Sequence, residues 1–238
     1  MPIRASSTAS RTRREATSLW KPARRRNGSQ FDEKRLALLG TAAALFRVRG
    51  YAEVSLNDVA DVLKITKPTL YYYVGSKDQL LYEIVTRGQE DILRSMEAID
   101  RGPGTGAEKL RNLLLQYIKV IASDFGACML LMRPRDLKAK FRVQIDARVK
   151  AANEYIYRVF ACGEKDGTLH IPDREVTLRV LFGSLNWIGR WYDPDGRIGP
   201  DEHANMHVDI LLNGILARRD QHFGSTRTSS RRRARKAS

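Results

Sequence analysis

The sequence predicts an all-α protein, with three short helices near its N-terminus and a larger helical body after them. Apolar residues recur at helical spacing through most of residues 29–217, and hydroxyl residues of the kind that begin helices precede several of these segments. The same range shows no convincing β-strand pattern. Its length and its apolar content of 42% are sufficient for one large or two modest domains with a hydrophobic core.

Helix starts are predicted at four hydroxyl residues in the first hundred positions. They are Ser29, Ser55, Thr66 and Ser76, and the corresponding helices are expected to end near Gly50, Leu63, Tyr73 and Arg101. Pro68 is compatible with the third helix, because it lies in the first turn, where no backbone N–H bond is required.

Further helices are predicted in the rest of the chain. We expect an amphipathic helix over 107–124, a short apolar piece over 128–132, a long helix over 136–162 and a turn at Gly163 and Gly167. Helices over 173–192 and 200–217 follow. The 173–192 segment is apolar nearly all round, so it must be covered on more than one side, either by a second subunit or within one chain.

The positive charge is concentrated at the two ends. Residues 1–26 carry eight basic residues and one acidic residue, and residues 224–238 carry six basic residues and no acidic one. Of the net charge of +15, only +2 belongs to residues 27–223. We therefore expect a disordered basic arm over 1–28, two folded domains over 29–76 and 77–223, and a disordered basic tail over 224–238. A solvated arm without function and an arm that contacts DNA both fit this composition.

No apolar run approaches the roughly 20 residues that span a bilayer, and residues 1–26 lack the apolar section of a signal peptide. A cytoplasmic protein without a membrane partner is expected. Cys128 and Cys162 are isolated in the sequence, so we expect buried packing cysteines and no disulfide framework.

Two of the predicted helix starts carry lysine, although acidic residues are favoured there. Lys67 follows Thr66 and Lys77 follows Ser76. A helix N-terminus presents unpaired N–H groups and a partial positive charge, so a lysine beside it suits the binding of an anion such as phosphate.

These helix starts form a helix-turn-helix pattern. Further residues recur around it at fixed spacing, namely Phe46, Gly50-Tyr51, Ser55, Asp58-Val59-Ala60, Thr66, Thr69 to Tyr73 and Ser76-Lys77-Asp78 with Leu80-Leu81. The resemblance of residues 36–81 to the DNA-binding region of TetR-family transcriptional repressors rests on them. It implies phosphate contacts from Ser55, Thr66, Tyr72 and Lys77. It also implies recognition-helix contacts from Lys67, Pro68, Thr69 and Tyr71 in a major groove of double-stranded DNA.

Lys64, Pro68 and Val74 depart from the family pattern. Lys64 stands where a glycine commonly makes the turn, so we expect a left-handed residue that costs about 1 kcal/mol. Successive residues of a helix point about 100° apart, so Tyr71, Tyr72 and Tyr73 cannot all be buried, and we expect Tyr72 to face outward.

The resemblance implies that the helical body forms a homodimer and encloses a small-molecule effector. The segment from Leu185 to Ile198 looks like the C-terminal pattern of TetR members that respond to acyl-CoA thioesters. Such a ligand needs an apolar wall and cations for its phosphates. The candidate ligand-binding residues are Arg133, Arg135, Arg179, Phe182, Trp187 and Arg190, for which surface arginines and core aromatics are the alternative interpretation.

Other chemistry has little support in the sequence. His203 and His207 are four residues apart on a predicted helix but lack a third ligand, so we expect solvent-facing or interface histidines and no metal or cofactor. The sequence therefore predicts a ligand-responsive, homodimeric repressor that binds a pseudo-palindromic DNA site. A sequence-independent DNA-coating protein and a helical enzyme are the alternatives.

Overall fold

The computed structural model describes residues 28–132, 137–191 and 197–214, and these residues form helices without any β-strand. The helices are α2 (Gly28–Arg49), α3 (Leu56–Leu63), α4 (Lys67–Val74), α5 (Lys77–Arg101), α6 (Gly106–Ala122), α7 (Asp124–Leu131), α8 (Ala139–Lys165), α9 (Arg174–Trp191) and α10 (Pro200–Asn213). The all-α prediction is confirmed.

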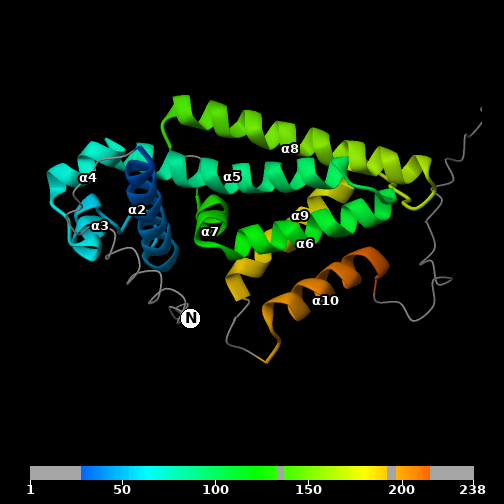
Figure 1. The fold of residues 1–238 in the computed structure, drawn as a ribbon. Helices are drawn as coiled ribbons and strands as arrows, with labels where there is room; N and C mark the ends of the chain where they lie inside the picture. The colour runs from blue at the N-terminus through cyan, green and yellow to red at the C-terminus, as the bar shows by residue number, and fades with distance from the viewer. Residues whose placement is uncertain (1–27, 133–136, 192–196, 215–238) are drawn as a thin grey trace, which may run out of the picture.

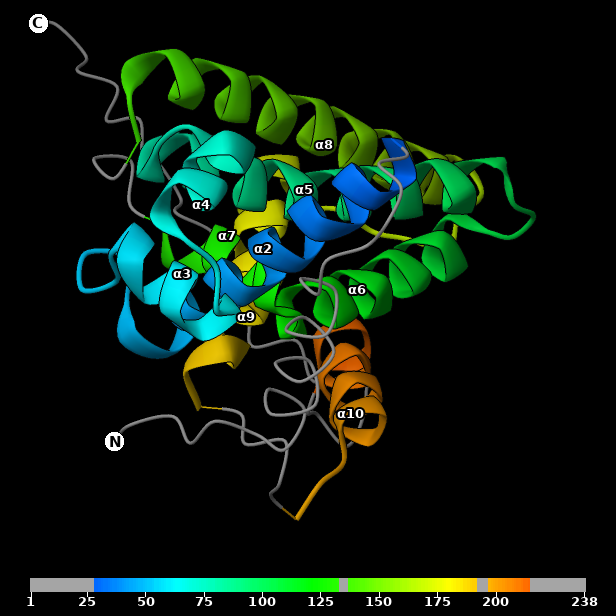
Figure 2. The ribbon, with the colours of Figure 1, turned by 60° about the vertical axis from the view of Figure 1, so that its left-hand side comes forward.

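Helices α2, α3 and α4 form a small unit, here called the head, at one end of the molecule, and α5 leads from it into a larger body of α5–α10 (Figure 1). Within the body, α8 lies along α5 on one side, and α6 packs on α5 from the other. Figure 2 brings the head forward and shows α3 and α4 beside each other, with α2 packed against them.

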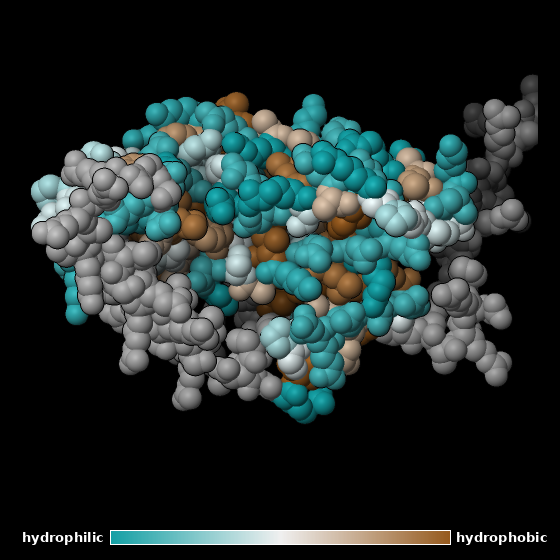
Figure 3. Space-filling model, viewed as in Figure 1, coloured by the Kyte–Doolittle hydropathy of each residue, from teal (hydrophilic) through white to brown (hydrophobic). Residues whose placement is uncertain are grey.

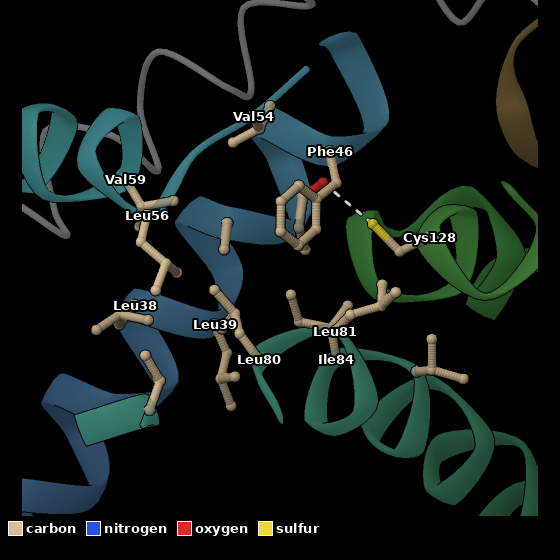
Figure 4. Packing of buried hydrophobic residues seen from close by; sticks show 14 of the residues in the cluster. Leu38, Leu39, Phe46, Val54, Leu56, Val59, Leu80, Leu81, Ile84 and Cys128 are labelled. Atoms are coloured by element: carbon tan, nitrogen blue, oxygen red, sulfur yellow. Dashed lines mark hydrogen bonds between the residues drawn. The ribbon is translucent and has the colours of Figure 1, made fainter. Parts of the chain in front are cut away.

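Two apolar cores fill the molecule. The first joins α2, α3 and α4 to the first turns of α5, and it also includes Cys128 from α7 and Phe141 from α8. Figure 4 shows this packing, with Phe46 and Leu39 of α2 facing Leu81 and Ile84 of α5. The second core lies among α5, α6, α8, α9 and α10 around the fully buried Phe160. Because the first core takes residues from α7 and α8, the head is packed directly onto the body.

Helix boundaries differ from the sequence predictions where packing or a cap decides them. Helix α2 begins at Gly28, so Ser29 does not precede its first turn. The predicted 107–124 helix ends at Ala122, because Ser123 caps a new helix by accepting the backbone N–H of Gly126 at 3.2 Å. Helix α10 ends at Asn213 and not near 217, since Gly214 has a φ of +76°.

Gly163 was expected in a turn, and this prediction was wrong. Helix α8 continues past it to Lys165, and the turn falls at Gly167, whose φ is +74°. Gly163 instead allows two helices to approach: a Cβ atom added to Gly106 of α6 would lie 2.2 Å from the Gly163 Cα atom. Gly163 therefore allows α6 and α8 to pack closely.

Among the described residues, no single helix combines the length and apolar content needed to cross a membrane. Helix α6 and the Asp124–Leu130 part of α7 have that length and apolar content only together, and the two helices are bent by 94° relative to each other.

Cys128 is buried as expected, whereas Cys162 is exposed, which corrects its assignment to buried packing.

Candidate nucleic-acid interface

The N-terminus of α3 is closed by the predicted capping box. Ser55 Oγ accepts the backbone N–H of Asp58 at 3.2 Å, and an Asp58 carboxylate oxygen accepts the Ser55 N–H at 2.7 Å. The Ser55 hydroxyl also donates to this carboxylate, and that hydrogen bond contributes most to holding the pKa of Asp58 below its usual value; the bond from the Ser55 N–H and the nearby Arg49 guanidinium add to it. Ser55 is exposed, so its hydroxyl lies at the surface beside the start of the helix.

Helix α4 begins with two paired threonines. Thr66 Oγ1 accepts the Thr69 N–H at 3.4 Å, and the two hydroxyl oxygens are 2.8 Å apart. One hydroxyl hydrogen makes this pair, which leaves the other available to a further acceptor. Lys67 and Pro68 occupy the exposed first turn of α4, and Pro68 causes no break there.

The three tyrosines of α4 point in different directions, as expected. Tyr72 is 70% exposed and Tyr71 is 50% exposed, while Tyr73 is partly buried. Phe31 at the start of α2 stacks on Tyr73 with 4.7 Å between ring centroids, and it meets Tyr72 edge to face at 5.8 Å. No local sequence pattern indicates this contact, because the residues are about forty positions apart. The contacts of Phe31 with both tyrosine rings hold the exposed Tyr72 side chain in a defined orientation on α4.

The start of α5 lies next to the start of α3. Ser76 Oγ accepts the Gln79 N–H at 3.1 Å, which confirms the predicted cap. The Lys77 ammonium lies 4.3 Å from the centroid of the Tyr51 ring and donates to the Ala52 carbonyl at 3.3 Å. Ser55, Tyr71, Ser76 and Lys77 line one surface concavity with a volume of about 420 Å³. Two helix starts, three hydroxyls, the Lys77 ammonium and the Glu53 carboxylate thus line one site. The helix starts and the lysine favour an anion there.

The turn between α3 and α4 is made by a left-handed lysine. Lys64 has φ 56° and ψ 45°, and it is the only residue other than glycine with a positive φ in the part of the chain that the structure describes. The Lys64 N–H donates to the Asp61 carbonyl and the Ile65 N–H to the Ala60 carbonyl, and these two hydrogen bonds end α3. The expected strained turn is confirmed.

Asp78 lies beside the concavity and binds groups from both head and body. Tyr51 donates its hydroxyl to Asp78 Oδ1 at 3.0 Å, and the Lys138 ammonium lies 2.9 Å from Oδ2. The hydrogen bond from Lys138 contributes most to holding the pKa of Asp78 below its usual value, and that from Tyr51 adds to it. Sequence reasoning assigned no role to Tyr51 or Lys138, because both contacts bridge distant parts of the chain.

The predicted effector residues do not converge on one site among the described residues. Arg179 is exposed on α9 and forms an ion pair with Glu175 one turn before it, at 2.6 Å. Phe182 packs edge to face on Tyr117 of α6 with a centroid distance of 4.9 Å, and Trp187 is 59% exposed. Arg133 and Arg135 lie outside the described residues, as does the side chain of Arg190. The ligand assignments therefore stay predictions.

A polar pair absent from the predictions lies beside Phe182. Tyr117 donates its hydroxyl to Asn186 Oδ1 of α9 at 2.5 Å, and burial raises the pKa of Tyr117. Figure 3 shows apolar side chains between α5 and α6. Two hollows, with volumes of about 460 and 570 Å³, share Ile99, Asn112 and Gln116; the larger lies between α5 and α6, and the smaller is also lined by Asp201, Ala204 and Asn205 of α10.

Of the two histidines of α10, His203 is buried, which corrects the expectation that it faces solvent, and His207 contacts α9, so the expected interface position stays a prediction. His203 is only 8% exposed, and His207 Nε2 lies 2.7 Å from Ser184 Oγ of α9. Burial lowers the pKa of both histidines. Within the described parts of the chain, no group of three or more possible metal ligands occurs.

The fold and the head define a class of protein: a DNA-binding regulator with a helix-turn-helix on a helical body. The family model described as "Bacterial regulatory proteins, tetR family" matches residues 38–84, and the model described as "Tetracyclin repressor-like, C-terminal domain" matches residues 103–215. The chain belongs to the TetR family of bacterial transcriptional regulators, which are DNA-binding factors and not enzymes.

Individual relatives agree with this membership. The HTH-type transcriptional repressor KstR2 of Rhodococcus jostii (strain RHA1) is 26% identical over 188 residues, which cover 77% of this chain and 92% of the relative. A TetR/AcrR-family regulator from Thermobifida fusca YX-ER1 is 32% identical with a TM-score of 0.62, covering 77% of this chain and 99% of that one. AibR, solved with isovaleryl coenzyme A and operator DNA, is 27% identical with a TM-score of 0.68, and the match covers 75% of this chain and 97% of AibR.

Proposed function

We propose that this chain is a homodimeric transcriptional repressor that binds a pseudo-palindromic operator and is released from it by a small molecule. The observation that carries the proposal is the concavity where the starts of α3 and α5 meet around Ser55, Tyr71 and Lys77. A helix-turn-helix head needs such a phosphate site on each side of its recognition helix, and α4 lies beside this one.

Roles within the head follow from exposure and position. Ser55, Thr66, Tyr72 and Lys77 are assigned to DNA phosphates, because each presents a donor near a helix start or on an exposed face. Lys67, Pro68, Thr69 and Tyr71 occupy the N-terminal half of α4, the part of a recognition helix that approaches base edges. Lys67 and Thr69 supply the polar groups, whereas Pro68 and Tyr71 supply apolar contacts.

The dimer is assigned to the outer faces of α9 and α10. Val176, Val180 and Trp187 lie along one side of α9, and each is 59% exposed. Met206 and Ile210 of α10 are exposed by 47% and 52%. Large apolar residues gathered on two helices that are joined by Ser184 and His207 favour association with a second copy. Gly183, between Val180 and Trp187, has open space around it and permits close approach.

An acyl-CoA thioester is the proposed effector class. AibR was solved with isovaleryl coenzyme A, and the Leu185–Ile198 segment resembles the sequence pattern of members that respond to such ligands. Phe182 of α9 packs on Tyr117 of α6, and these two residues are assigned to the apolar wall for the acyl group, whereas Arg133, Arg135, Arg179 and Arg190 are assigned to the phosphates. Binding would shift the dimer to a spacing that no longer matches successive half-sites.

Selection of bound DNA from a random pool tests this function. The full chain should enrich one two-fold symmetric sequence, and chosen CoA thioesters should then release the complex. Enrichment without symmetry, or equal binding to all sequences, would favour a sequence-independent DNA-coating protein. Failure of every CoA thioester to release a specific complex would remove the effector class and leave the DNA claim standing.

A further inference from the structure

A series of contacts connects Lys138, just before α8, to Lys77, the proposed phosphate-binding lysine at the start of α5. The Lys138 ammonium lies 2.9 Å from Asp78 Oδ2, and Tyr51 donates its hydroxyl to the other oxygen of Asp78 at 3.0 Å. The Tyr51 ring in turn lies 4.3 Å beneath the Lys77 ammonium. Lys138 precedes α8, so the series begins in the body and ends at the concavity.

Local helix stability does not account for the position of Lys138. It is the residue before the first turn of α8 and makes no side-chain capping bond there. A positive charge at a helix N-terminus is unfavourable, whereas the Asp78 carboxylate is favourably placed in the first turn of α5. The Lys138 and Asp78 side chains are 61% and 30% exposed, so their ion pair adds little to stability. The ion pair between Lys138 and Asp78 therefore acts chiefly on the charge beside the proposed DNA site.

Asp78 would compete with DNA for Lys77 if Lys138 were absent. The two residues are adjacent, and Lys77 acts electrostatically on the Asp78 carboxylate. An uncompensated carboxylate at this place would attract the Lys77 ammonium and repel a phosphate within the same Debye length. Lys138 supplies the compensating charge at Asp78 Oδ2.

We propose that Lys138 is a positioning residue for the DNA site, which keeps Lys77 available to phosphate by neutralising Asp78. The inference rests on the proposed operator binding. It also gives the body a direct influence on DNA affinity: a movement of the start of α8 away from α5 would expose the Asp78 charge beside the phosphate and weaken binding.

A double-mutant cycle on the full chain tests the inference with the selected operator. Lys138→Met should weaken binding by roughly 3- to 10-fold, as expected for one partly screened charge. In the Asp78→Asn background the same change should cost less than about 2-fold, because there is no longer a carboxylate to neutralise. Lys138→Arg should bind as the wild type does. Lys140→Met, which removes an exposed lysine that lies over Phe141, is the matched control and should leave binding unchanged.

Additive effects would overturn the inference. If Lys138→Met weakens binding equally with and without Asp78, then Lys138 contacts phosphate itself. The Asp78→Asn variant alone is a second test of the inference. A loss of affinity in this variant would show that the carboxylate supports DNA binding, which would also overturn the inference. Failure of the wild type to bind a selected site would instead refute the proposed function, and the inference with it. Thermal unfolding of each variant separates these outcomes from loss of the fold.

Discussion

Arg47 near the end of α2 forms an ion pair with Asp124 at the start of α7, with Nη1 and Oδ1 3.2 Å apart. The same nitrogen donates to the Ala122 carbonyl at 3.3 Å, and Cys128 of α7 donates its thiol to the Ala43 carbonyl of α2 at 3.2 Å (Figure 4). The recognition head is thus joined to the body through α7 as well as through α5. A displacement of α7 would be transmitted to α2, and the angle of the head on DNA would change with it.

Replacing Lys64 by glycine should stabilise the protein. Glycine removes a left-handed cost of about 1 to 2 kcal/mol but adds unfolded-state entropy, so the expected net gain is up to about 1 kcal/mol, or about 2 to 4 °C in Tm. Differential scanning calorimetry measures the change in Tm. Lys64→Ala is the matched control, because it removes the same side chain and keeps the strained backbone. Equal stability of the two variants would contradict the strain at residue 64.

Gly106→Ala should destabilise the body. The new Cβ atom would lie 2.2 Å from the Cα and N atoms of Gly163, and backbone on both sides leaves no flexible group to move. A loss of about 1 to 3 kcal/mol is expected in chemical denaturation. Gly40→Ala is the control: it also replaces a helical glycine, but its Cβ meets nothing within 4 Å, so stability should rise slightly. A neutral Gly106→Ala would show that α6 and α8 are not packed so closely.

Val180→Asp should convert the dimer to monomers without unfolding the chain. Val180 is 59% exposed on the proposed dimer face, where a buried unpaired carboxylate would be costly. Val143→Asp on the outer face of α8 is the control, because Val143 is 68% exposed and lies outside that face. Sedimentation velocity gives the result. Dissociation by both substitutions, or by Val143→Asp alone, would place the interface elsewhere.

The two cysteines should differ in reactivity towards a thiol reagent at about pH 8. Burial raises the pKa of the Cys128 thiol to about 12, so it stays protonated in the folded protein and should react only after unfolding. Cys162 is exposed and should react in the native state. Peptide mapping after brief labelling identifies the modified residue. Prompt native labelling of Cys128 would show that the packing of α7 against α2 opens readily.

The sequence predicted the head more completely than the body, and the reason is the range of the interactions. Ser55, Thr66 and Ser76 each hydrogen-bond a residue three positions away, so their caps are visible in the sequence. The contacts of Phe31 with Tyr73 and of Lys138 with Asp78 join distant positions, and no local pattern encodes them. Gly163 was misassigned for the same reason, since its neighbour across the helix pair is Gly106.

Lys77 and Thr66 are assigned to DNA phosphates, and the salt dependence of operator binding tests this assignment. Lys77→Ala should weaken binding about 10-fold and, with two copies in a dimer, lower the salt-dependence slope by about 2. Thr66→Ala should weaken binding as well, and Lys150→Ala, an exposed lysine in the middle of α8, should change neither quantity. Unchanged affinity and slope in both Lys77→Ala and Thr66→Ala would contradict the claim.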